Sequence, residues 1–328
     1  MFRTHLLAWY DAHGRALPWR ESHDPYRVWL SEVMLQQTRV AAVIAHYHEF
    51  LRRFPTVEKL ARAREASVLA AWSGLGYYRR ARMLHAAAKV VASEGMFPET
   101  ASELRKLPGV GRYTSAAIAS IAFGEAVAVV DGNVERVLQR YLGRKLEGET
   151  FWLTAEKLLD RARPGDFNQA MMELGATVCT PRAPACLTCP VVELCATRGE
   201  MPGGSKAAQQ TKREIHYALD YRENGGRDGA VFLVQRALDE SLMAGMWELP
   251  QILRSRRKGT LAFTVRHSIT TTNYVVRVWR DAGSKDVPGK MIALRRLPRL
   301  AMTGLARKIL RHAGLMTTRN VLTRRALQ

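Results

Sequence analysis

Residues 107–124 read LPGVGRYTSAAIASIAFG, and the fold predicted for this chain starts from them. A helix that ends near Leu107 would meet a short turn in which Gly109 and Gly111 permit backbone conformations that side chains exclude. The helix rich in Ala and Ser that follows would expose N–H groups at its N-terminus, where a phosphate can bind. An ordinary helix–helix connection has the same residues, so this turn alone leaves both interpretations open.

The next stretch along the chain, residues 126–140, reads AVAVVDGNVERVLQR. Its apolar run ends at Asp131, and a new helix is predicted to begin there. Asp131 or Asn133 is then a helix N-cap, with Glu135 in support. Capping does not exclude a second role, because a carboxylate held by helix N–H groups can stabilise a cation beside it.

A second carboxylate, Glu32, lies upstream in DPYRVWLSEVMLQQTRV, residues 24–40. Apolar residues flank it on nearly every side of the predicted helix, so burial should raise its pKa and suit it to act as a general acid. A Glu that faces solvent is the alternative. A protonated carboxyl and an ionised one together meet the needs of glycosidic bond scission, including scission of an N-glycosidic bond to a base.

All four cysteines lie close together, as Cys179, Cys186, Cys189 and Cys195 in the pattern C-x6-C-x2-C-x5-C. Buried structural cysteines would be scattered, and disulfide frameworks belong to short secreted chains. The four are therefore predicted to be metal ligands, for a tetrahedral zinc or a cubane iron–sulfur cluster. The spacing, with three prolines in the loop, resembles the [4Fe-4S] loop of the helix-hairpin-helix DNA glycosylases.

Composition favours nucleic acid as the partner. The 328 residues include 50 Lys and Arg against 30 Asp and Glu, a formal charge of +20, which supplies sequence-independent attraction to DNA. Ribosomal and membrane-surface proteins are also basic. No run of eighteen apolar residues and no signal-peptide core occurs, so the chain is expected to be neither membrane-spanning nor exported, and to be cytoplasmic and nucleoid-associated.

The periodicity divides the chain into two parts. Apolar spacings of three and four predict helices over residues 1–200, and residues 201–215, small and polar at their start, are predicted to be a linker. Alternating β-branched and aromatic runs then predict a small mixed or antiparallel sheet over residues 216–298. Residues 299–328 are predicted to be a basic tail, either on phosphates or in solvent.

Five motifs together resemble the MutY-type adenine DNA glycosylases, which remove adenine mispaired with 8-oxoguanine. They are SEVMLQQTRV, WSGLGYYRRARMLHAAA, LPGVGRYTSAAI, VVDGNVERVL and NQAMMELGATVCTPRAPACLTCP. The resemblance implies a mainly α glycosylase domain: a six-helix part over residues 24–127, and a cluster part of residues 1–23 and 128–200. It also implies a [4Fe-4S] cofactor, double-stranded DNA as partner, and a monomer.

The resemblance also implies roles for individual residues. Glu32 would protonate adenine, Asp131 would stabilise the sugar cation, and Tyr113 and Asn133 would support them. The flipped adenine would lie in a pocket. The residues implied to line it are Trp19, Arg20, Leu35 and Glu173. The residues implied to contact DNA are Gln37, Thr38, Leu75, Tyr77, Gly109, Gly111 and Thr270.

The part after the linker resembles the Nudix-like domain by which that family recognises 8-oxoguanine, most clearly in LMAGMWELP, residues 242–250. The predicted fold of this part is therefore a small α+β domain. No Glu-rich metal signature follows it. Where the family has a loop such as Phe-Ser-His, this chain has Ile269, Thr270 and Thr271, of which Thr270 keeps a hydroxyl. Discrimination of the opposite base is the step that this change puts in question.

Two alternatives remain open. The endonuclease III type shares the hairpin and cluster but cleaves DNA through a Lys Schiff base, and this chain has Tyr113 where that Lys would stand. A phenol cannot form the imine. A cluster-bearing DNA-binding or redox sensor without catalysis would lack Glu32 or Asp131, and the chain has both. The sequence therefore favours a monofunctional glycosylase.

Overall fold

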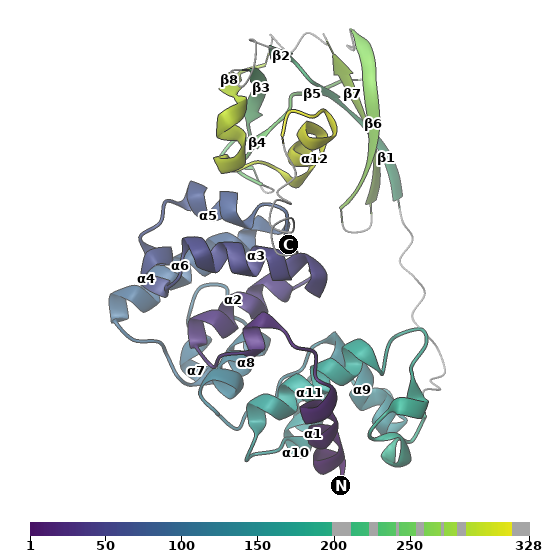
Figure 1. The fold of residues 1–328 in the computed structure, drawn as a ribbon. Coiled ribbons are helices and arrows are strands. Elements are labelled where there is room, and N and C mark those ends of the chain that lie inside the picture. Colours follow the sequence, from purple (N-terminus) through teal and green to yellow (C-terminus); the bar gives the residue numbers. More distant parts are fainter. Residues whose placement is uncertain are drawn as a thin grey trace, which may run out of the picture. The chain divides into compact units, whose positions relative to one another are not determined.

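A computed structural model describes residues 1–198, 211–222, 229–240, 243–253, 259–269, 272–280 and 287–316. The chain forms two compact units (Figure 1). The first, the helical unit, comprises residues 1–62 and 82–205. The second, the α+β unit, comprises residues 63–81 and 206–328.

The helical prediction for the N-terminal part is confirmed. Asp24 begins one helix by accepting a hydrogen bond from the Arg27 N–H, and Thr100 and Glu103 form a reciprocal capping box at another. The α-helices up to residue 198 are α1 (Phe2–His13), α2 (Pro25–Leu35), α3 (Val40–Arg53), α4 (Val57–Ala61), α5 (Glu65–Trp72), α6 (Tyr78–Glu94), α7 (Ala101–Leu104), α8 (Arg112–Ala122), α9 (Gly132–Leu142), α10 (Glu149–Leu158) and α11 (Pro164–Thr177). Short 3-10 turns are η1 (Pro18–Arg20), η2 (Cys186–Thr188) and η3 (Val192–Leu194).

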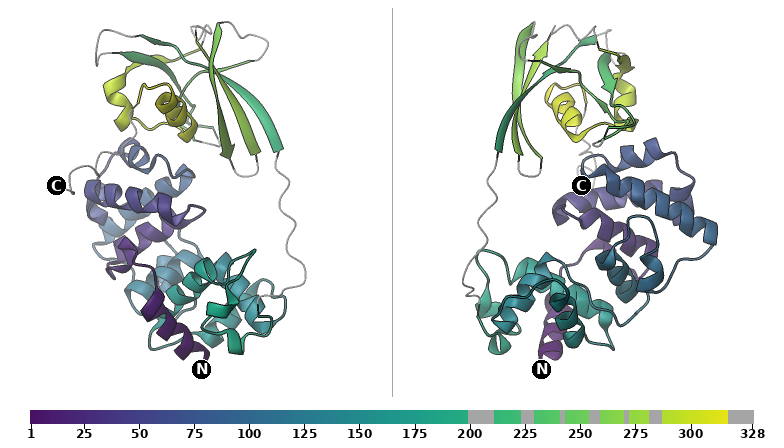
Figure 2. Two further views of the ribbon diagram at one scale, coloured as in Figure 1. Left: turned by 45° about the vertical axis from the view of Figure 1, so that its right-hand side comes forward. Right: turned by 180° about the vertical axis from the view of Figure 1, so that it is seen from behind.

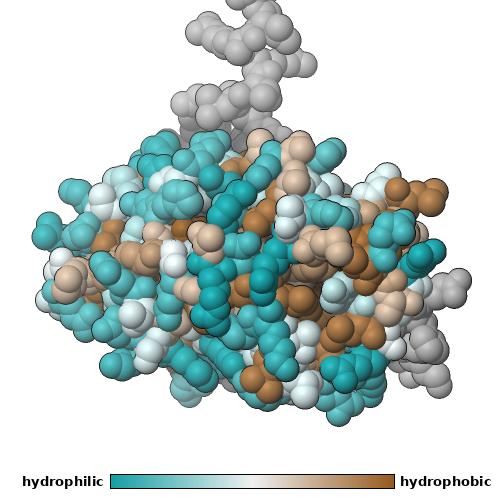
Figure 3. Space-filling model, turned by 90° about the horizontal axis from the view of Figure 1, so that it is seen from below, coloured by the Kyte–Doolittle hydropathy of each residue, from teal (hydrophilic) through white to brown (hydrophobic). Residues whose placement is uncertain are grey.

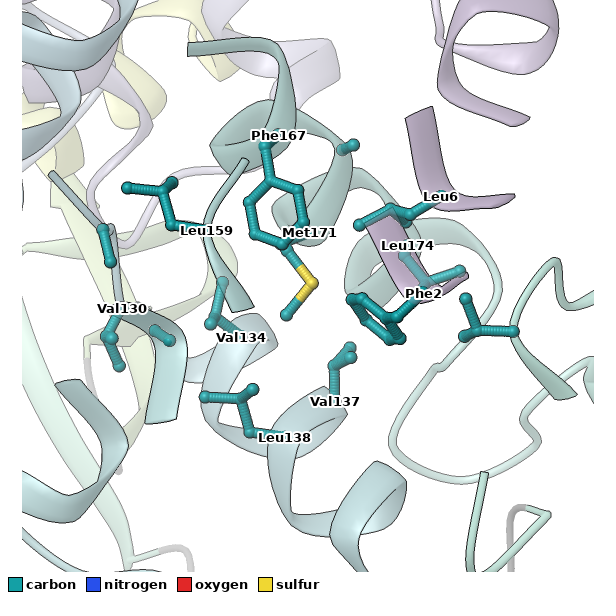
Figure 4. Packing of buried hydrophobic residues seen from close by; sticks show 14 of the residues in the cluster. Phe2, Leu6, Val130, Val134, Val137, Leu138, Leu159, Phe167, Met171 and Leu174 are labelled. Atoms are coloured by element: carbon teal, nitrogen blue, oxygen red, sulfur yellow. The ribbon is translucent and has the colours of Figure 1, made fainter. Parts of the chain in front are cut away.

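One apolar cluster joins α1, α9 and α11 (Figure 4). Phe167 and Met171 of α11 pack between Leu6 of α1 and Val134 of α9, and all four side chains are buried. Cys179 and Cys189 pack against the edge of this cluster. The packing fixes the start of α9, where Asp131 lies, relative to α11 and the cysteine loop.

The strands of the α+β unit form two sheets (Figure 2). In the sheet that contains β1, β5, β6 and β7, the strands β1 and β7 run parallel and the other pairs are antiparallel. The predicted mixed sheet is therefore confirmed. The strand order is β5-β1-β7-β6 in one sheet and β2-β3-β4 in the other, where β8 also pairs with β3. The strands are β1 (Thr211–Ala218), β2 (Tyr221–Arg222), β3 (Ala230–Gln235), β4 (Trp247–Glu248), β5 (Gln251–Ile252), β6 (Thr260–Ile269), β7 (Thr272–Arg280) and β8 (Lys290–Ala293).

The predicted basic tail is wrong for its first half. Residues 294–299 form the 3-10 helix η6 (Leu294–Arg299), and α12 (Gly304–His312) follows. Leu305, Ile309 and Leu310 are buried in the core that both sheets share. Between the Lys and Arg residues of this stretch lie apolar residues at helical spacing. Burial of these apolar residues packs the helix in the core. Residues 317–328 lie outside the described residues.

Two boundaries differ from the expected ones. Strand β1 begins at Thr211, so the last residues of the predicted linker pair in the sheet, while residues 201–210 lie outside the described part. Residues 63–81, which include helix α5 and the loop after it, were predicted within the six-helix part but belong to the α+β unit. The Ser73 and Tyr78 hydroxyls both donate to the Met302 carbonyl of that unit. Truncation after the linker would therefore remove an acceptor that this loop uses.

Within the described residues no helix is both long and apolar enough to cross a membrane. Figure 3 shows one face of the molecule, on which hydrophilic side chains predominate and hydrophobic ones form separate patches.

Candidate active site

One pocket of about 580 Å³ in the helical unit brings together most of the residues predicted for the site. The predicted residues that line it are Trp19, Arg20, Glu32, Leu35, Gln37, Thr38, Tyr113, Asp131, Asn133 and Glu173. They come from η1, α2, α8, α9 and α11 and from the segments next to these elements. Residues far apart in sequence therefore surround a single space large enough for a planar base.

Glu32 lies inside the apolar helix α2 with only 6% of its surface exposed. The Tyr113 hydroxyl donates to Glu32 Oε2 over 2.6 Å. Burial raises the pKa of Glu32 to about 7, with a further increase from the Asp131 charge, while the Tyr113 hydrogen bond and the Arg20 charge act the other way. The expectation that burial would raise this pKa agrees with the structure, and the carboxyl can hold a proton near neutral pH.

Asp131 is the N-cap of α9, as the sequence suggested. Its Oδ1 accepts from the backbone N–H groups of Asn133 and Val134 at 2.9 and 2.8 Å. Its Oδ2 accepts from Asn133 Nδ2 at 2.9 Å, while the side chain remains partly exposed in the pocket. The Asp131 carboxylate therefore caps α9 and faces the pocket at the same time, so capping does not exclude a role in the pocket.

Tyr113 connects the Glu32 carboxyl to helix α11. Its hydroxyl contacts both Glu32 and the Met172 sulfur, which lies 3.3 Å away. Burial, with the nearby Glu32 charge, raises the Tyr113 pKa well above its ordinary value. The phenol therefore stays protonated and acts as a hydrogen-bond donor, which orients the Glu32 carboxyl.

Glu173 forms a second charged centre in the pocket wall, 1% exposed. Its two oxygens accept from the Arg15 guanidinium at 2.5 and 2.9 Å, and Oε2 also accepts from Arg20 Nη2 at 2.9 Å. Burial raises its pKa, but the hydrogen bonds and charges of the two arginines outweigh burial, so the net pKa is lowered. A buried anion held in this way has a fixed orientation.

Sequence reasoning missed several residues of the pocket. Arg15 is the most important, because its guanidinium and its backbone N–H both donate hydrogen bonds to the Glu173 carboxylate. No local pattern marks it, since its partner is 158 residues away. The other missed lining residues are Leu17, Gln36, Val40, Val130, Gln169, Met172 and Ala176.

The residues predicted to contact DNA include two with unusual backbones. Gln37 and Tyr77 have φ values of 55° and 46°, in the left-handed region that favours glycine. Such strain is concentrated at functional sites in proteins. Leu75 and Tyr77 belong to the α+β unit. Thr270 lies outside the described residues.

The two hairpin glycines differ. Gly109 has φ 75°, and a Cβ there would lie 2.4 Å from Met83 Cβ, so both backbone and packing require glycine. Gly111 has φ −91° and no atom within 4 Å of a built Cβ. The prediction that Gly111 is needed for a backbone conformation that side chains exclude is therefore wrong. Gly111 is the N-cap of α8 and carries no side-chain cap, which leaves the first N–H groups of this helix open to an anion.

The four cysteines line one cavity, together with Arg140 and residues of the surrounding loop. Arg140 donates to Cys179 Sγ at 3.4 Å and to the Thr180 carbonyl at 2.7 Å. Across the described residues, which include all four cysteines, no three His, Cys, Asp or Glu side chains are grouped so as to hold a single metal ion. The four thiols therefore surround a shared space.

A chain of hydrogen bonds connects the active site with the cysteine loop. Asn133 donates to Asp131 and accepts from Arg136 Nη2 at 2.8 Å. Arg136 also donates to the carbonyls of Gly175 and Cys179, both at 2.7 Å. The position of Asp131 is therefore tied to that of the first cysteine.

The raised Glu32 pKa sets an expected pH dependence. If Glu32 donates a proton during the reaction, its protonated form is lost as pH rises through about 7. Single-turnover base release at saturating enzyme should be flat below that pH and fall about tenfold per unit above it. A rate that rises across this interval would contradict the assignment of Glu32 as the acid.

Comparisons with known proteins agree with this geometry. Residues 30–161 match the family model described as HhH-GPD superfamily base excision DNA repair protein. The solved structure of a thermostable thymine-DNA glycosylase is 31% identical, with a TM-score of 0.57 over 60% of this chain and 94% of that one. A complex of endonuclease III with DNA, 24% identical with a TM-score of 0.52, shows the shared fold alone.

These matches define the class: the chain belongs to the HhH-GPD superfamily of base excision DNA repair proteins. Within that class its curated relatives include the adenine DNA glycosylases of human and mouse, which confirms the family predicted from the motifs. The human protein is 41% identical over 312 residues and the mouse protein 42% over 311, each covering 76% of this chain. The chain spans 57% and 60% of their lengths.

Proposed function

We propose that this protein is a monofunctional adenine DNA glycosylase that hydrolyses the N-glycosidic bond of adenine mispaired with 8-oxoguanine or guanine. The observation that carries this proposal is the pair of carboxylates in one pocket. Glu32 is buried, with its pKa raised to about 7 so that it can hold a proton near neutral pH, and Asp131 faces the same space from the start of α9. An acid and an anion with such different surroundings suit an oxocarbenium-like transition state.

The reaction follows from these positions. The Glu32 carboxyl gives its proton to a ring nitrogen of adenine, and the bond from the base to C1′ breaks with its electrons on the base. The Asp131 carboxylate stabilises the resulting sugar cation. Water adds its oxygen at C1′ and returns a proton to Glu32, so the products are free adenine and an abasic site. Tyr113 and Asn133 hold the two carboxylates, and Arg15 and Arg20 hold Glu173 against the base.

Monofunctional chemistry gives a clear prediction. Tyr113 donates to Glu32 from the place where a lyase would have its Lys, and a phenol cannot form a Schiff base with the opened sugar. Borohydride treatment during the reaction should therefore trap almost no covalent complex, and strands should break only after heat or alkali. Efficient trapping would favour the endonuclease III alternative.

DNA is the proposed partner, bound as a duplex by a monomer. The hairpin between α7 and α8 presents an uncapped helix N-terminus at Gly111, which suits a phosphate without reading sequence. The net charge of +20 adds attraction along the backbone. A cytoplasmic, nucleoid-associated location remains part of the proposal.

The cysteines are proposed to hold a [4Fe-4S] cluster. The four thiols line one cavity, and four thiolates are the ligand set of a cubane iron–sulfur cluster. When bound, the cluster would supply structural stability to a loop with little core of its own. Cys189→Ser should therefore lower the yellow-brown absorption, the bound iron and the melting temperature together. A colourless protein with stoichiometric zinc would overturn the assignment.

The experiment that tests the whole proposal is single-turnover base release from defined duplexes at fixed salt. Adenine opposite 8-oxoguanine and opposite guanine should be released, and adenine opposite thymine should not. A duplex with thymine opposite guanine tests the activity named for the thymine-DNA glycosylase structure. Release of thymine without release of adenine would overturn the proposal. Thr270→Ala, at the altered Ile269–Thr271 loop, is expected to reduce any preference for 8-oxoguanine.

A further inference from the structure

The loop between α5 and α6, residues 73–77, has a constrained backbone. Gly74, Gly76 and Tyr77 have φ values of 115°, 68° and 46°. Tyr77 is a tyrosine in a backbone region that favours glycine, so this conformation is strained. Tyr77 is 45% exposed, while Leu75 is only 5% exposed. The surrounding structure must therefore hold an exposed aromatic ring on a strained backbone.

Two side chains hold the carbonyls that precede Tyr77. Trp72 Nε1 donates to the Gly76 carbonyl at 3.1 Å. Arg80 Nη2 donates to the Leu75 carbonyl at 3.2 Å. Both donors lie in the flanking helices α5 and α6, so they join the two ends of the loop to its middle.

Arg80 also contacts the ring itself. Its Cζ lies 5.3 Å from the centre of the Tyr77 ring and 5.5 Å from the centre of the Trp72 ring. Both distances are within the range of cation–π attraction. Burial lowers the Arg80 pKa to about 10, which still leaves the guanidinium charged at neutral pH. One planar cation thus contacts two rings and a carbonyl at once.

The other side of the loop is fastened to the rest of the α+β unit. Ser73 Oγ and the Tyr78 hydroxyl donate to the Met302 carbonyl at 3.3 and 3.0 Å. The residues on both sides of the loop are therefore fixed, and Arg80 contacts the Tyr77 ring.

We propose that Arg80 is a positioning residue that holds the Tyr77 ring in the orientation needed to enter the DNA duplex beside the mispair. This inference rests on the proposed function and takes Tyr77, which the resemblance implies to contact DNA, as the wedge that enters the base stack. A ring ordered before binding loses less conformational freedom when it enters the base stack. Lys could supply the charge at position 80 but not a planar group that stacks on a ring while donating to the Leu75 carbonyl.

A direct phosphate contact by Arg80 is the competing explanation, and a mutant cycle separates the two. The cluster-loaded full-length protein is prepared as Arg80→Ala, Arg80→Lys, Tyr77→Ala and the Tyr77→Ala/Arg80→Ala double variant. Arg79→Ala is the matched control, because Arg79 is an exposed neighbour and its loss changes the charge equally. The duplex carries 2-aminopurine beside the mispair and a target sugar that resists hydrolysis, so wedge entry appears as increased fluorescence.

The wild-type protein should increase the fluorescence, and Arg80→Ala and Tyr77→Ala should each lose most of that increase. Affinity for the mispaired duplex should fall about tenfold in Arg80→Ala, and the double variant should be no worse than Tyr77→Ala alone. Arg80→Lys should resemble Arg80→Ala, and Arg79→Ala should keep the fluorescence increase.

Additive losses in the double variant would overturn the proposal. So would a salt dependence of binding that drops by about one ion in Arg80→Ala, the sign of a lost phosphate contact. The proposal would also be overturned if the Arg80→Lys protein melted like wild type and kept the full fluorescence increase. Failure of the proposed function would be separate: the wild-type protein would then release no adenine from any hydrolysable duplex, whatever the fluorescence of the variants.

Discussion

Glu32→Gln is expected to reduce the single-turnover rate of adenine release by roughly 10²–10⁴-fold. The amide has nearly the shape of the protonated carboxyl and can still accept the hydrogen bond from Tyr113. It cannot give up a proton to the leaving base. Binding of the mispaired duplex should therefore persist, and the pH dependence above about 7 should disappear along with the activity.

The stability of this variant provides an independent check. The folded protein binds the Glu32 proton more tightly than the unfolded chain, so ionisation of Glu32 lowers stability as pH rises from about 4.5 through about 7. Gln has no such ionisation, and Glu32→Gln should melt no lower than wild type at pH 8. Glu135→Gln, at an exposed carboxylate on α9, is the matched control and should keep normal activity. Near-normal adenine release by Glu32→Gln would refute the assignment.

Asp131→Asn should have the second large effect, a loss on the order of 10³-fold in the same rate, because a neutral amide cannot stabilise the sugar cation. The variant can keep its cap, since the amide oxygen can still accept from the Asn133 and Val134 N–H groups. Its new NH₂ would face Asn133 Nδ2, a donor, where the carboxylate oxygen now accepts.

That clash sets the cost to stability. Asn133 cannot simply turn its amide, because its oxygen already accepts from Arg136. The free energy of unfolding should therefore fall by about 1–3 kcal/mol, and the melting temperature by a few degrees, while DNA binding survives. The measurement is single-turnover release beside thermal melting. Activity within tenfold of wild type would mean that Asp131 is only a cap.

The two carboxylates could be predicted because their local surroundings are encoded nearby. Glu32 has apolar neighbours throughout its own helix, and burial of α2 follows from that pattern. Asp131 ends an apolar run before a new helix, so its N-cap geometry is local as well. The cysteine spacing likewise lies within one short segment.

Arg15 could not be predicted in the same way. Its contact with Glu173 joins α11 to the segment after α1, and only the packing of these two helices brings the side chains together. Arg136 is similar, because the Cys179 carbonyl to which it donates is 43 residues away in the sequence. Helix α12 was missed for another reason: its basic residues Arg307, Lys308 and Arg311 alternate with the apolar residues that pack in the core.

The sequence alone was enough to predict the helical and α+β parts, the two carboxylates that line the pocket, the grouping of the four cysteines and the family, because each depends on residue type and short-range spacing. Tertiary structure decided what lies together at long range: the arginines on Glu173, the link from Asp131 to the cysteine loop, and the loop of Tyr77 held by Met302. The physical reason is that hydrogen bonds and burial act over a few ångströms, and the chain path that creates such proximity leaves no periodic trace in the sequence.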